Sequence, residues 1–139
     1  QRGDGKWYAI EIVQGRLVLE DCDITSQSLS CVAIHGGSDP QVRRNRINDG
    51  KQSGVFVYEN GLGTIEDNDI FGNAMSGVAI KEGGNPTVRR NRIHGNAYEA
   101  VWVYDNGSGT FEDNDLRDNV RGAWDIGKGC KVKRARNQE

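Results

Sequence analysis

Residues 66–70, Glu66-Asp67-Asn68-Asp69-Ile70, recur every 23 residues along the chain, and the sign of their charge reverses each time. The other copies are Glu20-Asp21-Cys22-Asp23-Ile24, Arg43-Arg44-Asn45-Arg46-Ile47, Arg89-Arg90-Asn91-Arg92-Ile93 and Glu112-Asp113-Asn114-Asp115-Leu116. A sixth segment, Lys133-Arg134-Ala135-Arg136, is basic again after a slightly shorter spacing. A fixed period of this length is typical of a repeat architecture. Because the charge alternates, unlike charges meet when each copy lies directly against the next.

Apolar residues occupy three fixed places in each copy. The first place alternates with other residues at period two, as a β-strand does. The three series are Val32/Ile34, Val55/Val57, Val78/Ile80 and Val101/Val103; Leu19, Val42, Ile65, Val88 and Phe111; and Ile24, Ile47, Ile70, Ile93 and Leu116. Three short strands cannot form a sheet within one copy, so equivalent strands must pair in parallel from copy to copy. The sequence therefore predicts an all-β fold, a right-handed single-stranded parallel β-helix of about six coils of 23 residues, with three strands per coil.

Polar and small residues at repeated positions agree with this stacking. Amides that share one position can hydrogen-bond from coil to coil, which predicts an asparagine ladder at Asn45, Asn68, Asn91 and Asn114 and a shorter one at Asn73, Asn96 and Asn119. Small residues precede the first strand, where a larger side chain would strike the next coil: Cys31, Gly54, Gly77, Ala100 and Ala123. The charge pattern predicts that Glu66 lies between Arg43 and Arg89, and Asp69 between Arg46 and Arg92.

The composition limits the classes of partner. The 139 residues carry 18 Lys and Arg against 20 Asp and Glu, a net charge of −2, so neither nucleic acid nor an anionic membrane is favoured. Three cysteines without metal-binding spacing favour a reducing compartment, hence a cytoplasmic location. We expect residues 1–139 to form a single β-helix domain of a longer protein. The open coil ends can join chains into an oligomer.

The outer face of the first strand is the candidate binding site. Its outward positions are Ala33, Phe56, Ala79 and Trp102, and the positions beside them are His35, Tyr58, Lys81 and Tyr104. This spacing predicts Lys81 between Tyr58 and Tyr104 as a cation–π stack. Three acidic residues, Glu59, Glu82 and Asp105, follow on consecutive coils about 4.8 Å apart and break the alternation of charge.

Two interpretations of this face remain open. In the first, large and small residues alternate only to fill space, and the carboxylates point into water. In the second, the face is a binding stripe in which aromatics make apolar contact and carboxylates meet a basic partner or a cation. We expect no resident cofactor; the alternative is Ca²⁺ held by Glu59, Glu82 and Asp105.

No catalytic residue is assigned from the sequence. The two histidines, His35 and His94, belong to different strands and cannot pair, so each is expected to be a surface histidine. Phosphate-binding loops, Cys-x-x-Cys pairs and serine-nucleophile motifs are absent. We therefore leave enzymatic activity uncertain, with the sequence pointing away from it.

Several segments resemble the parallel β-helix repeat family, the group described as carbohydrate-binding proteins and sugar hydrolases. The segments are Gly54-Val55-Phe56-Val57-Tyr58-Glu59-Asn60-Gly61, Glu66-Asp67-Asn68-Asp69-Ile70 and Asn85-Pro86-Thr87-Val88-Arg89-Arg90-Asn91. Within that group the chain looks most like the β-helix of F-box substrate receptors and of bacterial multidomain proteins. In polysaccharide lyases of this fold, the outer face of the first sheet is the substrate cleft. The Asp-Pro-His-Glu motif of alginate epimerases is missing, since Asp39-Pro40-Gln41 lacks its last two residues.

The short turns and missing motifs favour a non-enzymatic protein-recognition or scaffold module that presents the first-sheet face to a protein partner. One alternative is a carbohydrate-active β-helix fragment, a polysaccharide lyase, hydrolase or epimerase, or a polysaccharide-binding domain. The other is a purely structural or oligomerisation segment.

Overall fold

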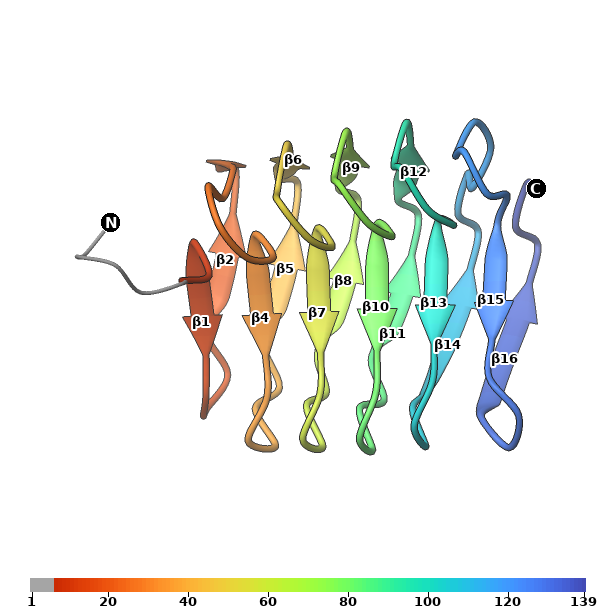
Figure 1. Cartoon of the computed structure of the whole chain (residues 1–139). Coiled ribbons are helices and arrows are strands. Elements are labelled where there is room, and N and C mark those ends of the chain that lie inside the picture. The colour runs from red at the N-terminus through yellow and green to blue at the C-terminus, as the bar shows by residue number, and fades with distance from the viewer. Residues whose placement is uncertain (1–6) are drawn as a thin grey trace.

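The computed structural model, which describes residues 7–139, is a solenoid of short parallel strands (Figure 1). The predicted domain also included residues 1–6, which lie outside the described residues. No helix is present between residues 7 and 139. The strands are β1 (Ile10–Ile12), β2 (Val18–Glu20), β3 (Asp23–Ile24), β4 (Val32–Ile34), β5 (Gln41–Arg43), β6 (Arg46–Asn48), β7 (Val55–Val57), β8 (Thr64–Glu66), β9 (Asp69–Phe71), β10 (Val78–Ile80), β11 (Thr87–Arg89), β12 (Arg92–His94), β13 (Val101–Val103), β14 (Ser108–Glu112), β15 (Trp124–Ile126) and β16 (Lys131–Ala135).

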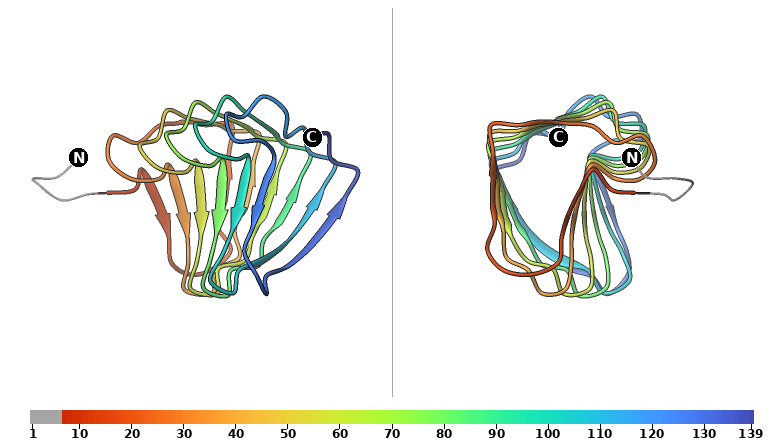
Figure 2. Two further views of the ribbon diagram at one scale, coloured as in Figure 1. Left: turned by 45° about the vertical axis from the view of Figure 1, so that its right-hand side comes forward. Right: turned by 90° about the vertical axis from the view of Figure 1, so that its left-hand side faces the viewer.

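Equivalent strands of successive coils form three parallel sheets, as predicted. The first sheet has six strands in the order β1-β4-β7-β10-β13-β15, the second has six (β2-β5-β8-β11-β14-β16), and the third has four (β3-β6-β9-β12). Viewed along the solenoid axis, the coils superimpose (Figure 2, right). The last two coils contribute only isolated bridges at Asp115 and Gln138 to the third sheet. The solenoid thus completes about five full turns, slightly fewer than the six predicted.

The core is the column of inward apolar residues that the sequence repeat identified. Val55, Ile65 and Ile70 represent the three series, and all three are fully buried. Burial of apolar area at every coil interface is the main stabilising term, worth about 25 cal/mol per Å². At the last coil Trp124 replaces the inward valine and meets Phe111 edge to face, with ring centroids 5.4 Å apart.

The spacing of the last segment differs from the expectation. Ala135 pairs with Glu112, and Arg136 bonds Asp113, so the 23-residue register continues without shortening. The basic residue equivalent to Arg90 is therefore Arg136, whereas Lys133 lies on β16 opposite Thr110. The run of basic residues in the sequence concealed this register.

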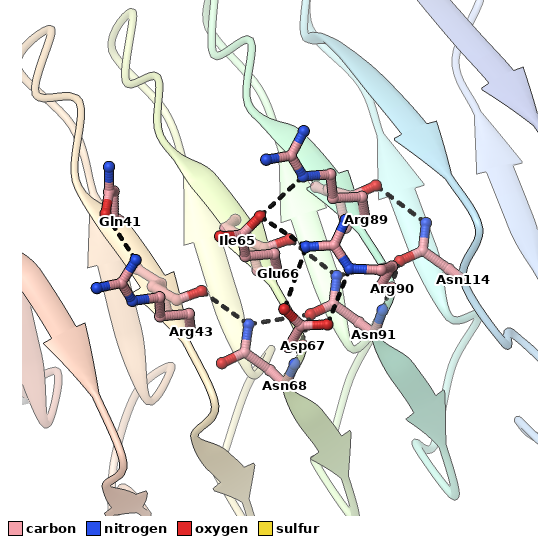
Figure 3. Close-up of polar contacts among 12 residues, drawn as sticks. Gln41, Arg43, Ile65, Glu66, Asp67, Asn68, Arg89, Arg90, Asn91 and Asn114 are labelled. Carbon is pink, nitrogen blue, oxygen red and sulfur yellow. Dashed lines mark hydrogen bonds and ion pairs between the residues drawn. The ribbon is translucent and has the colours of Figure 1, made fainter.

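The predicted asparagine ladder is present, and each amide spans two coil interfaces. Asn68 Oδ1 accepts bonds from the backbone nitrogen and Nδ2 of Asn45, at 3.0 and 3.1 Å. Asn68 Nδ2 donates to the carbonyl of Val42 and to Asn91 Oδ1, both at 2.9 Å (Figure 3). The pattern continues through Asn114 to Asn137, a member that the sequence reading missed, and the shorter ladder is also present, at Asn73, Asn96 and Asn119. Because buried polar groups need partners, the longer ladder fixes the corner between the second and third sheets, and the shorter one fixes the turn that leads from the third sheet to the first.

Small residues before the first sheet are required by contact with the next coil. A Cβ atom on Gly77 would lie 2.2 Å from Ile93 Cγ2, and one on Gly54 would lie 2.9 Å from the carbonyl oxygen of Gly77. Cys31 and Ala100 occupy the equivalent positions and are fully buried. The predicted steric limit is therefore confirmed.

The alternating acidic and basic residues have the predicted register, but among the described residues each arginine of this series that forms an ion pair does so with acidic residues of the preceding coil only. Glu66 lies between Arg43 and Arg89 in the second sheet. Its carboxylate bonds Arg89 at 2.8 Å and Arg90 at 3.1 Å, and Arg43 bonds the side chain of Gln41 (Figure 3). Arg43 also bonds Glu20, at 2.8 Å, on the preceding coil. An arginine fork that reaches back to one coil has few donors left for the other. Within residues 7–139 these ion pairs therefore connect each acidic coil to the basic coil that follows it, but not each basic coil to the next acidic one.

Asp69 also departs from its predicted pairing. It lies between Arg46 and Arg92 in register, yet its carboxylate oxygen is 2.7 Å from His94 Nε2. Arg46 instead stacks over the ring of Phe71, 5.3 Å from its centroid. His94 is thus a partly buried hydrogen-bond partner of Asp69 rather than the simple surface histidine that was expected.

The cysteines are unpaired, and their environments differ. Cys31 is buried, which raises the pKa of its thiol to about 12, whereas Cys22 is exposed. The cytoplasmic location inferred from these residues stays a prediction. The described range contains no helix of the length and apolar character needed to cross a membrane.

Candidate functional site

The first-sheet face is defined here as the outward side chains of the first sheet together with the two residues that follow each strand. Between neighbouring strands, Ala33 pairs with Phe56, Phe56 with Ala79, and Ala79 with Trp102, as the repeat predicted. Glu11 on β1 and Asp125 on β15 occupy the two ends of this row. In Figure 1 these strands form one continuous row from β1 to β15.

The aromatic residues of this face form two stacks. Phe56 and Tyr58 stack with ring centroids 4.6 Å apart, and Trp102 and Tyr104 stack at 4.0 Å. Each stack comes from one strand and the residue after it, because side chains two positions apart project from the same side of a sheet. Stacked rings of this kind are stabilised by about 0.5–1.5 kcal/mol beyond their burial.

A hollow of about 40 Å³, which we call the aromatic slot, lies between the two stacks. Ala79 belongs to the intervening coil, and its small side chain leaves the space open between Phe56 and Trp102. The slot is lined by Ser53, Phe56, Met75, Ala79, Trp102 and Tyr104, among others. It is shallow, so it suits a ligand that lies along the surface rather than one enclosed by the protein.

Lys81 lies beside the aromatic slot, but its predicted partners need correction. Its ammonium is 5.6 Å from the ring centroid of Phe56 and 6.0 Å from that of Tyr104. Tyr58, which we expected on one side of Lys81, instead stacks on Phe56 and on His35. Spacing along the chain identified the coil correctly but could not give the direction of a flexible side chain.

His35 is held between two carboxylates. Its Nε2 is 2.7 Å from Glu11 and its Nδ1 is 3.1 Å from Glu59, on the coils before and after it. The ring also stacks on Tyr58 at 4.6 Å, and only 13% of the side chain is exposed. The expectation of an isolated surface histidine is therefore wrong. Because carboxylates accept hydrogen bonds, both nitrogens donate at once only in the imidazolium form.

The acidic row of Glu59, Glu82 and Asp105 lies on tight turns after the strands. All three residues have left-handed backbone, with φ between 46° and 49°. Two of them have a polar partner: Glu59 lies 3.1 Å from His35 Nδ1, and Glu82 lies 3.6 Å from the Lys81 ammonium. Across residues 7–139, no three His, Cys, Asp or Glu side chains are grouped closely enough to hold a metal ion. A calcium role for the row stays a prediction.

Burial and nearby negative charge act on the tyrosines of the face. Desolvation raises the pKa of Tyr58 well above its ordinary value, and Tyr8, Glu11 and Glu59 add to the shift. The pKa of Tyr104 is raised first by burial and then by Asp105 and Glu82. Both hydroxyls therefore stay neutral near pH 7.

The sequence reading missed several residues of this face. Tyr8, whose ring lies 6.5 Å from that of Phe56, and Glu11 belong to a first coil in which the step from Glu11 to Ala33 is shorter than 23 residues. Met75 lies in a turn rather than in an alternating strand. Tyr8 and Glu11 could not be found from the repeat, because the first coil interrupts the 23-residue period. Met75 could not be found because only the three-dimensional path of the turn brings it to the slot.

Asp39 and Pro40, the nearest match to the epimerase motif, have a structural role. Asp39 Oδ1 accepts a hydrogen bond from the backbone nitrogen of Gly63 at 3.0 Å. Gly63 has φ of 108°, and Pro40 packs where a Cβ on that glycine would lie. This pair therefore supports the corner between the first and second sheets, outside the first-sheet face.

Solved structures similar to this chain are those of the periplasmic alginate epimerase AlgG. The match has a TM-score of 0.64 with 14% identity and covers 92% of this chain and 40% of that one. Two variants of the same enzyme match with TM-scores of 0.60 and 0.57, at 15% and 16% identity and with the same coverage. This chain thus spans about 40% of the length of those proteins, and the likeness is one of fold. No curated protein sequence matches significantly.

These findings correct the first functional interpretation. A non-enzymatic protein-recognition module was expected, yet the neighbours in fold are an enzyme named for a polysaccharide, which favours the carbohydrate alternative. The comparison with F-box receptors was not tested and stays a prediction. The family model described as "Right handed beta helix region" matches residues 4–138, nearly the whole chain, including the handedness that the sequence predicted. The chain therefore belongs to the right-handed β-helix family.

Proposed function

We propose that this chain binds a polysaccharide along the first-sheet face, as part of a carbohydrate-active protein. The observation that carries the proposal is the aromatic slot between the Phe56/Tyr58 and Trp102/Tyr104 stacks. The C–H faces of a pyranose ring are apolar and pack on aromatic rings, while the ring hydroxyls need polar groups at the edges. Ser53 and Gln52 line the slot and supply such groups.

The shape of the face supports an extended ligand. The two aromatic stacks are two coils apart, about 10 Å from strand spacing, with the alanine floor of Ala79 between them. A linear polymer can cross several coils and contact both stacks, whereas a small molecule in a shallow slot buries little of its surface. Other hollows, of about 330 and 490 Å³, lie against Trp7 and against Lys131. Trp7 and Tyr8 both line the first of these hollows, and the described residues that line the second include no aromatic side chain. Neither hollow therefore offers the pair of facing ring stacks found at the slot.

The experiment is isothermal titration of a panel of oligosaccharides into the native chain and into Trp102→Ala. We expect at least one oligosaccharide to bind and the variant to bind it about tenfold more weakly, since a lost sugar–aromatic stack is worth about 1–2 kcal/mol. The matched control is Trp7→Ala, which removes a tryptophan outside the aromatic slot. Absence of binding across the panel, or equal loss in both variants, would contradict the proposal.

Catalysis is tested separately, by incubating the native chain with the same panel of oligosaccharides and analysing the products. Bond cleavage gives new reducing ends or unsaturated-uronate absorbance, and epimerisation changes the anomeric proton signals. His35, with Glu11 and Glu59 on its two nitrogens, is the group on this face with acid–base chemistry. If turnover occurs, we expect His35→Gln to abolish it while binding at Trp102 persists.

A further inference from the structure

The first-sheet face carries an excess of negative charge. Its acidic residues are Glu11, Glu59, Glu82, Asp105 and Asp125, and its lysines are Lys81 and Lys128. Five acidic groups against two lysines leave a net charge of −3 when His35 is neutral and −2 when it is protonated. Charges on neighbouring coils, about 4.8 Å apart, lie within the Debye length of about 8 Å at physiological ionic strength and are screened little. A polyanion along this face is therefore repelled.

Lys81 shows what kind of group the face accommodates. Its ammonium has the Phe56 ring 5.6 Å away, the Tyr104 ring 6.0 Å away and the Glu82 carboxylate 3.6 Å away. Two aromatic faces and a carboxylate are the usual surroundings of a bound ammonium group. The Lys81 side chain is 29% exposed and flexible, so it can leave this position for water. The adjacent slot, at about 40 Å³, has room for one small polar substituent of a sugar whose ring lies over the aromatic stacks.

From this geometry we infer that the ligand of the first-sheet face is a cationic glycan, a polymer of amino sugars with free ammonium groups, whose ammonium takes the place that Lys81 occupies in the free protein. This inference rests on the proposed polysaccharide-binding function and adds the charge class of the sugar. It separates this chain from a binder of polyuronates, for which a lysine in this position would be the attractive group and the acidic row the repulsive one.

The test uses three oligomers of equal length: glucosamine, its N-acetylated neutral counterpart, and a hexuronic acid. Each is titrated into the native chain at low and high salt. We expect the glucosamine oligomer to bind most tightly, the neutral one less tightly and the uronate least, with the difference shrinking at high salt.

Two variants are expected to change the affinity for the glucosamine oligomer in opposite directions. Lys81→Met removes the competing ammonium and keeps the aliphatic chain, so we expect the glucosamine oligomer to bind roughly threefold to tenfold more tightly. Glu82→Gln is expected to weaken the same oligomer by a similar factor. Lys133→Met makes the same change of charge at an exposed position of β16 and is the control. It should leave the affinity for the glucosamine oligomer unchanged.

The outcomes separate the inference from the function beneath it. If none of the three oligomers binds, the proposed function fails and the inference fails with it. If the uronate binds as tightly as the glucosamine oligomer, or if Lys81→Met weakens the glucosamine oligomer, the polysaccharide site stands and its cationic selectivity is wrong.

Discussion

At the scale of single residues, each coil depends on one buried amide. Asn68 is 3% exposed, and its side chain has four hydrogen bonds, two accepted from Asn45 and one donated to each of Val42 and Asn91. An alanine at this position would leave the backbone nitrogen of Asn45 and the carbonyl of Val42 buried without these partners. Buried polar groups left without partners cost about 1–3 kcal/mol each, so losing one amide of the ladder should lower the free energy of unfolding by more than the loss of a single hydrogen bond.

We therefore expect Asn68→Ala to lower the free energy of unfolding by about 3 kcal/mol. Asn85→Ala is the matched control, because Asn85 is exposed and its side chain has no hydrogen bond among the described residues. The control should change stability by less than about 0.5 kcal/mol. Urea denaturation followed by circular dichroism measures both, and equal stability of the two variants would contradict the structural role of the ladder.

The candidate site shows what single residues reveal before a structure is known. Phe56, Tyr58, Trp102 and Tyr104 were placed on one face because a strict 23-residue period fixes both the coil and the side of the strand. The contacts of Lys81 could not be predicted, since a long side chain chooses among rotamers according to its neighbours. The short first coil, which brings Glu11 beside His35, likewise interrupts the only pattern from which it could have been inferred.

At the scale of elements, ion pairs join the strands of the second sheet in twos. Glu66 and Glu112 flank Arg89 on β11 from the two neighbouring strands. Glu66 bonds Arg89 and Arg90 and is only 13% exposed, whereas Glu112 takes part in none of the ion pairs found within residues 7–139. The alternation of charge predicted the register of the strands but not this asymmetry, because both directions satisfy the same sequence pattern.

The asymmetry gives a prediction for two otherwise equivalent glutamates. Glu66→Gln should lower the free energy of unfolding by about 1 kcal/mol, since a largely buried carboxylate that pairs with two arginines is lost. Glu112→Gln should have an effect near zero. Thermal unfolding at low salt compares them directly, and a larger effect for Glu112 would show that the pairs form in the other direction.

At the scale of the whole molecule, stacked coils give a rigid, uniformly repeated surface. The strands of the first sheet keep one register from β4 to β13, so the spacing of the aromatic stacks is set by the backbone and not by mobile loops. The sequence predicted this architecture almost completely, because the period, the ladders and the small residues all agree. It did not predict the ligand, since a flat aromatic face on a β-helix suits a protein or a sugar equally well until its charge and slot are seen.

Polysaccharide binding at the aromatic slot can be followed through the NMR signals of the indole N–H groups of the tryptophans. Trp102 lines the slot, Trp124 packs against Phe111 at the end of the core, and Trp7 lies near the start of the described chain. During titration with a glucosamine oligomer, we expect a saturable shift of the Trp102 signal, with the Trp7 and Trp124 signals unchanged. A shift of Trp7 or Trp124 without Trp102, or binding that leaves all three signals in place, would contradict binding at the aromatic slot.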